Sequence, residues 1–388
     1  MTDPTTATAE RLTRLLAYIA ADPGNLALRQ DAIRETFETQ QWDTARSLID
    51  AGLQLHPGEC GLLAFSGCAY LQARRYSDAE RDLTAALSGE PEAHEWHFSL
   101  AFALFMQTRY AEALQELSTD AIVQAVPHAL LLRARCLHHL GRLTEAIAQC
   151  NRQLQAAPGD PSTHGLLALL LHEQFDSVAA QGHIETALRA DPNQPDALLA
   201  LASTQADARQ NEAARETFNR LLRADPQCGR AWFGLGMVEM TERRIAAAAQ
   251  ALELAATHMP QHIGTWHALA WIRVTRGEVA AAGLAFERAM ALDRNFAETH
   301  GGIAVIAALE GREEDARAGI KRALRLDPRT MSAQYARILL LQRHGRHTEA
   351  EAVLQEFMAR PTGDGDRLYR DVVAVLPMSE AQRDLRLN

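Results

Sequence analysis

An alanine recurs every 34 residues along this 388-residue chain, and only the step from Ala113 to Ala146 is one residue shorter. The ten alanines are Ala45, Ala79, Ala113, Ala146, Ala180, Ala214, Ala248, Ala282, Ala316 and Ala350. A strict period of this length is typical of stacked arrays, in which each unit is one supersecondary element that cannot bury its apolar face alone. The period therefore predicts a repeat structure that functions through a surface and not through a pocket.

Other places in the repeat are as regular. The residue twelve before each alanine is Ala or Gly in all repeats except the first and last, which have Ile33 and Ile338. The residue four after each alanine is always apolar, from Ile49 to Leu354, and lies one helical turn further on the same face. Proline, which ends helices, stands twelve residues after seven of the alanines. Each repeat is therefore predicted to be a helix, a short turn and a second helix.

With these features the chain resembles the tetratricopeptide repeat family. The resemblance rests on Trp232, Leu235 and Gly236 in a first helix, on Ala282, Phe286 and Ala289 in a second helix, and on Ala-Asp-Pro endings such as 190–192, and it covers roughly residues 10–361. It implies an all-α fold, a right-handed α-solenoid superhelix of about ten helix-turn-helix repeats with a capping helix at each end.

The repeats run on without a linker, so we expect one solenoid over residues 26–361. Residues 1–25 are predicted to form an N-terminal cap helix, and residues 362–388 a C-terminal cap helix and tail. The single short step predicts an irregularity between the third and fourth repeats. The ten repeats are expected at about 26–59, 60–93, 94–126, 127–160, 161–194, 195–228, 229–262, 263–296, 297–330 and 331–361.

Charge and apolar patterning narrow the kinds of partner. A net charge of -10 argues against nucleic acid, whose phosphates need a basic surface. Apolar runs such as 302–309 are too short to cross a bilayer, so no membrane insertion is expected. The start, Met1–Glu10, lacks the pattern of a signal peptide, and five cysteines without CxxC spacing do not form a disulfide framework, so a cytoplasmic location is expected. Lys321 is the only lysine, a bias that favours a bacterial source.

We expect no catalytic residue, metal or cofactor. No serine or cysteine has a base that the sequence places beside it. The run His94-Glu95-Trp96-His97 is one residue short of the zinc-binding HExxH spacing. His97, His164 and His300 occupy the repeat place of Trp232 and Trp266, so packing between helices explains them better than metal binding. Cys150 falls on a buried stripe and is predicted to be a small core residue.

The family resemblance implies a concave groove that is lined by first helices and holds a peptide or a partner helix. By helical spacing, the residues three before and one, four and five after the small residue should face this groove. Large or ionisable side chains gather there in two clusters. The first cluster is Phe98, Phe102, Phe105, Met106, Arg135, His138, His139 and His172, and the second is Phe233, Met237, Met240, His267 and Trp271. The alternative for both clusters is packing between successive first helices.

The function predicted from these features is that of a non-catalytic scaffold or adaptor that binds a protein or peptide in the groove of the superhelix. The alternative is the substrate-recognition arm of an enzyme of the sulfotransferase or glycosyltransferase type, with the catalytic part outside this chain. The lysine and asparagine clamp with which some family members hold a C-terminal carboxylate is missing from the groove places, so that ligand is not expected.

Overall fold

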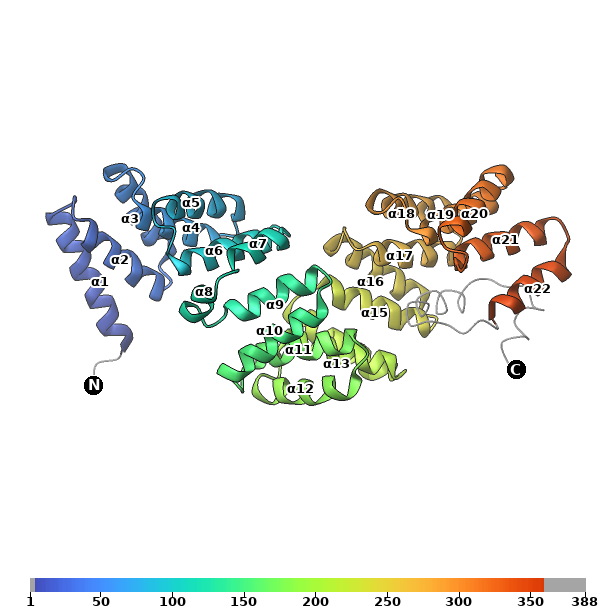
Figure 1. Cartoon of the computed structure of the whole chain (residues 1–388), viewed down its shortest axis with the longest axis horizontal. Helices are drawn as coiled ribbons and strands as arrows, with labels where there is room; N and C mark the ends of the chain where they lie inside the picture. Colours follow the sequence, from blue (N-terminus) through green and yellow to red (C-terminus); the bar gives the residue numbers. More distant parts are fainter. Residues whose placement is uncertain (1–3, 359–388) are drawn as a thin grey trace. The chain divides into compact units, whose positions relative to one another are not determined.

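The computed structural model describes residues 4–358, and every regular element in that range is an α-helix (Figure 1). The all-α repeat fold that the period predicts is confirmed. The chain divides into two compact units, Met1–Ala190 (unit 1) and Asp191–Asn388 (unit 2). No helix in residues 4–358 combines the length and apolar character needed to cross a membrane. The predicted C-terminal cap, 362–388, lies outside the described residues.

The helices of unit 1 are α1 (Pro4–Ala21), α2 (Leu26–Glu38), α3 (Trp42–Leu55), α4 (Cys60–Gln72), α5 (Tyr76–Gly89), α6 (His94–Met106), α7 (Tyr110–Glu116), α8 (Asp120–Ala125), α9 (Ala129–His139), α10 (Leu143–Ala156), α11 (Pro161–Glu173) and α12 (Ser177–Ala190). Those of unit 2 are α13 (Pro195–Asp207), α14 (Asn211–Ala224), α15 (Gly229–Thr241), α16 (Ile245–His258), α17 (Ile263–Thr275), α18 (Val279–Leu292), α19 (Ala297–Glu310), α20 (Glu313–Leu326), α21 (Met331–Arg343) and α22 (His347–Met358).

The repeating alanines hold the paired helices together. All ten are buried, with at most 1% of their surface exposed. In the facing first helix, the small residue leaves space for the apolar residue four after the alanine: a Cβ added to Gly67 would lie 2.5 Å from Cγ of Leu83, and one added to Gly236 would lie 2.8 Å from Cγ of Leu252. Since larger side chains would collide there, the period in the sequence is a consequence of close helix packing.

The ends of the helices follow from local chemistry. The side chains of Asn25 and Asp160 accept hydrogen bonds from backbone N–H groups in the first turns of α2 and α11, and Pro161 opens α11. Between the two helices of each repeat, one residue adopts a left-handed backbone conformation. Four repeats place glycine there, as at Gly277, and six place another residue, such as Phe175 with φ of 63°.

The second helix of the third repeat is broken. It consists of α7 and α8, and residues Leu117–Thr119 between them are not helical. Ile122 from α8 is buried in the same core cluster as Leu104 from α6, so both pieces still pack against the first helix of the repeat. The break lies within the step from Ala113 to Ala146, where the spacing is one residue short.

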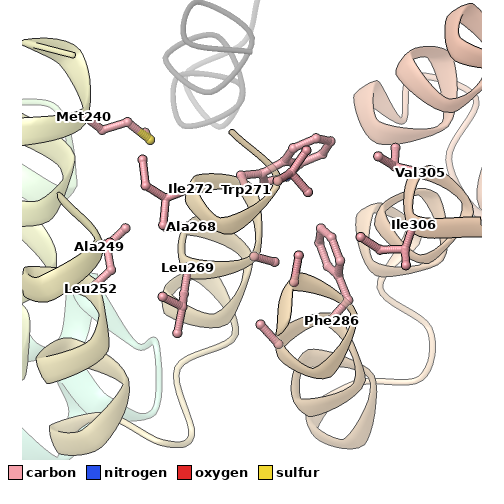
Figure 2. Packing of buried hydrophobic residues seen from close by; sticks show 14 of the residues in the cluster. Met240, Ala249, Leu252, Ala268, Leu269, Trp271, Ile272, Phe286, Val305 and Ile306 are labelled. Atoms are coloured by element: carbon pink, nitrogen blue, oxygen red, sulfur yellow. The ribbon is translucent and has the colours of Figure 1, made fainter. Parts of the chain in front are cut away.

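The core of unit 2 forms where successive first helices meet the second helices behind them (Figure 2). Phe286 from α18 fills the centre of this cluster, and a Cβ added to Gly302 on α19 would lie 2.3 Å from its ring. In unit 1, Cys150 is fully buried, which confirms its predicted place in the core. None of the five cysteines, all of which lie within residues 4–358, forms a disulfide.

Candidate protein-binding surface

One apolar stripe runs along α6 and is referred to here as the α6 surface. Its residues are Phe98, Phe102, Phe105 and Met106, which share one face of the helix. The other faces are covered, since Leu100, Ala101, Ala103 and Leu104 are buried. Phe102 and Met106, by contrast, keep 36% and 40% of their surface exposed. The α6 surface is therefore an apolar area that the described residues of unit 1 leave partly uncovered.

Aromatic contacts hold one side of the α6 surface in place. The ring of Phe105 packs edge-on against Tyr110, with centroids 5.4 Å apart, and against His139 at 5.5 Å. The rings of Tyr110 and His139 stack face to face at 4.3 Å. These three residues come from α6, α7 and α9, and the burial of Tyr110 raises the pKa of its phenol. The α6 surface therefore rests on a fixed aromatic support.

The remaining predicted residues of the first cluster lie on α9 and α11. Nε2 of His138 lies 2.8 Å from a carboxylate oxygen of Glu173, which links α9 to α11. The rings of His138 and His139 are 5.6 Å apart. Arg135 and His172 are half-buried on the same two helices. Because α6 contacts α9 and α9 contacts α11, the structure brings the whole first cluster onto three neighbouring helices of unit 1.

The second cluster is different, and its prediction as an open groove wall needs correction. Met240 and His267 are fully buried and Trp271 is 2% exposed. The indole of Trp271 packs edge-on against the rings of Phe286 and Tyr335, each at 5.8 Å. These side chains are therefore packed between helices, which was the alternative to an open groove wall.

The other two members of the second cluster, Phe233 and Met237, are half-buried against the same core. Nε2 of His267 lies 2.8 Å from the hydroxyl of Thr299, and burial lowers the pKa of this histidine to about 4. The second cluster therefore serves the stability of unit 2 and presents no exposed apolar area of the kind found on α6.

Histidines that could suggest a metal site have structural partners. Nδ1 of His97 lies 2.7 Å from a carboxylate oxygen of Glu116, and Nδ1 of His164 lies 2.8 Å from Nδ1 of His183. Desolvation and the neighbouring His164 lower the pKa of His183. Within residues 4–358, no three His, Cys, Asp or Glu side chains are grouped so that they could hold a metal ion.

Sequence reasoning missed Tyr110, which joins the α6 surface to α9. The groove rule considers only first helices, whereas Tyr110 opens α7, a second helix. A signal was present nonetheless, because an aromatic residue one turn before the alanine of the third repeat can reach the end of the first helix.

Comparison with known proteins supports the repeat architecture. No curated protein matches the sequence. Among solved structures, the human IFIT1 dimer with PPP-AAAA is similar with a TM-score of 0.56 and 14% identity, over 98% of this chain and 94% of that chain. PilF from Pseudomonas aeruginosa is similar over 54% of this chain and 95% of its own, with 16% identity and a TM-score of 0.47. YrrB, a TPR protein with an unusual peptide-binding site, is similar over 48% of this chain and 97% of its own, with 19% identity and a TM-score of 0.40.

At these identities the similarity concerns the fold alone. The sequence model of the tetratricopeptide repeat matches four segments of the chain, which together span more than half of it. These segments are residues 66–122, 119–161, 199–261 and 311–364. The repeating alanines, the small residues opposite them and the paired helices agree with this match, and the chain belongs to the tetratricopeptide repeat family.

Proposed function

We propose that this protein is a non-catalytic scaffold or adaptor that binds a segment of a protein partner on the α6 surface of unit 1. The observation that carries the proposal is that Phe102, within α6, and Met106, its last residue, are exposed although the opposite face of the helix is buried. Leaving two large apolar side chains in water costs roughly 1 kcal/mol or more, since about 25 cal/mol is lost for each Å² of apolar surface left uncovered. A partner that covers them recovers this free energy.

The chemistry of the surface suits a protein more than a nucleic acid. Phe, Met and His side chains on a firm aromatic support are typical of the energetic centres of protein interfaces. The net charge of -10 disfavours a partner made of phosphates. The proposed partner is therefore a protein or peptide, bound without a cofactor or metal, and the enzyme-arm alternative has no specific support among the described residues.

We also propose that the protein works in the cytoplasm. The five free cysteines suit a reducing compartment. Burial raises the pKa of the Cys136 thiol to about 12, which keeps this residue in its unreactive protonated form.

The proposal can be tested by selecting peptides from a random phage-displayed library against the full chain and measuring their affinity by fluorescence polarisation. A Phe102→Ala, Met106→Ala double variant should bind the selected peptides about tenfold more weakly or worse, because it removes two central apolar anchors. Leu284→Ala is the matched control: Leu284 is 62% exposed on α18 of unit 2. Equal affinity for the double variant and the parent chain, with unchanged helicity by circular dichroism, would contradict the proposal.

A further inference from the structure

The helix beside the α6 surface is basic in an acidic protein. The chain has 49 acidic and 39 basic residues, yet residues 121–144, which contain α9, hold no Asp or Glu. This stretch contains three arginines and three histidines. Three of these side chains, Arg135, His138 and His139, are the α9 members of the first cluster and are called the α9 surface here.

The α9 surface continues the α6 surface in register. Arg135 directly follows the buried small residue of its helix, Ala134, as Phe102 follows Ala101. His139 corresponds in the same way to Met106. Equivalent places on successive first helices of one unit face the same side, so basic groups stand next to the exposed apolar ones.

The two surfaces are also joined directly. His139 stacks on Tyr110 and contacts Phe105, so that a side chain lying on the α6 surface is next to the α9 surface. Carboxylates are also present on α6 and α11. Glu95 lies in the first turn of α6, and Glu173 is already engaged by His138.

We propose that the partner segment is acidic: one or two apolar side chains pack on Phe102 and Met106, and neighbouring carboxylates lie against Arg135 and His139. This inference rests on the proposed function and adds the chemical class of the partner. Charge complementarity supports it, because a carboxylate beside a partly desolvated arginine forms a stronger hydrogen bond than a neutral acceptor does. Opposite electrostatic potentials on the two partners also speed their association.

A second stretch without Asp or Glu, residues 254–277, does not offer the same chemistry. Its His267 and Trp271 are buried. Basic and exposed apolar groups therefore stand side by side on α6 and α9, but not in this part of unit 2.

Single-stranded RNA also binds basic surfaces with aromatic side chains. A peptide fits better here because a nucleic-acid strand needs a series of cationic contacts along its backbone. Arg135 is the one arginine of the α9 surface, and Arg133, on the same helix, has two buried guanidinium nitrogens, Nε and Nη1. RNA is therefore treated as an outcome of the test.

The test uses the full chain and four fluorescein-labelled probes, measured by fluorescence polarisation. They are a glutamate-rich peptide with a central Phe-Leu pair, the same peptide with glutamine in place of glutamate, the glutamate-rich peptide without the apolar pair, and an oligo-adenylate RNA. The first probe should bind best, by about tenfold over the second and third, and its affinity should fall as salt rises from about 50 to 300 mM.

Arg135→Gln should weaken the first probe about five- to tenfold and leave the glutamine peptide unchanged. Arg135→Lys retains the charge and should recover most of the affinity, which separates a charge effect from misfolding. Arg288→Gln and Leu284→Ala, four residues apart on α18, are the matched controls for lost charge and lost apolar surface.

The outcomes separate this inference from the proposed function. If the glutamate and glutamine peptides bind equally well and both depend on Phe102, the inference is wrong and the proposed function stands. If no peptide depends on Phe102, both are wrong. Tighter binding of the RNA than of any peptide, lost in Arg135→Gln, would replace the acidic peptide with a nucleic acid.

Discussion

The indole Nε1 of Trp232 donates a hydrogen bond to the backbone carbonyl of Pro226, six residues earlier, at 2.8 Å. Trp266 makes the same bond to Pro260, also at 2.8 Å. Histidine takes this role in three other repeats, as where Nε2 of His300 lies 2.9 Å from the carbonyl of Arg294. Tryptophan and histidine are interchangeable at this place because each carries a ring N–H that reaches the loop before its helix.

Trp232→Phe should therefore destabilise unit 2 by about 1 kcal/mol beyond any packing loss, because the carbonyl of Pro226 loses its donor. The measurement is the midpoint of urea unfolding followed by circular dichroism. Trp232→His supplies a donor in the manner of His300 and should recover part of the loss. If the histidine variant is no more stable than the phenylalanine variant, the hydrogen bond is not the reason for the residue choice.

His267 should make unit 2 sensitive to acid. Its pKa is lowered to about 4 in the fold, from 6.5, because the ring is buried. The unfolded chain therefore binds a proton between these values while the folded chain does not. The stability that depends on this group is present above pH 6.5 and is lost as the pH falls towards 4, by about 3 kcal/mol in total.

Urea unfolding at pH 7, 5 and 4 tests this prediction, with His267→Asn as the comparison because it cannot titrate. The stability difference between the parent chain and His267→Asn should shrink steadily as the pH falls. A difference that stays constant over this range would mean that His267 is not responsible for the acid sensitivity.

Glu298 should change the stability of unit 2 with pH in the direction opposite to His267. Its carboxylate on α19 accepts hydrogen bonds from the N–H groups of Met331 and Ser332 at the start of α21, at 2.7 and 3.0 Å. Desolvation nonetheless raises its pKa. The folded state then binds a proton more readily than the unfolded state, so the contribution of Glu298 to stability is most favourable at low pH and declines as the pH rises through the folded pKa.

The comparison of the parent chain with Glu298→Gln at pH 4.5 and pH 8 isolates this effect. The stability of the parent relative to the variant should be lower at pH 8 than at pH 4.5. The reverse order would show that the hydrogen bonds from α21 outweigh the cost of burying the charge.

The buried ion pair between Arg215 on α14 and Glu239 on α15 should be a strong determinant of stability. Only 11% and 7% of the two side chains are exposed. Glu239→Ala leaves a buried guanidinium without its main partner and should cost about 3–5 kcal/mol in urea unfolding. The double variant Arg215→Met, Glu239→Leu should be markedly more stable than Glu239→Ala, since no buried charge then lacks a partner. Equal loss in both variants would contradict this account.

The fold could be predicted from the sequence because its cause is local and repeated. Gly236 marks a place where Leu252 from the partner helix must fit, and a small residue recurs at this place in every repeat except the first and last. The second cluster could not be assigned in this way. Helical spacing states which face of α17 bears Trp271, but not that Phe286 and Tyr335 surround its ring.

The shared face of the α6 residues could be predicted from helical spacing, whereas their role in binding stays a prediction. Phe102 lies one residue after the buried Ala101, on the face that helical spacing assigns to the groove, and 36% of its surface is exposed. Tyr110 was not predictable from first-helix spacing, because its place depends on how α7 begins beside α9.

The break between α7 and α8 has a consequence for how unit 1 loses its structure. In a stack in which each repeat contacts only its neighbours, unfolding spreads from one repeat to the next. Local stability then decides where unfolding stops being cooperative. Two short helices in place of one long one leave the third repeat without the continuous second helix that its neighbours have. The α6 surface belongs to the same repeat, so a bound partner would add contacts to the repeat that contains the break.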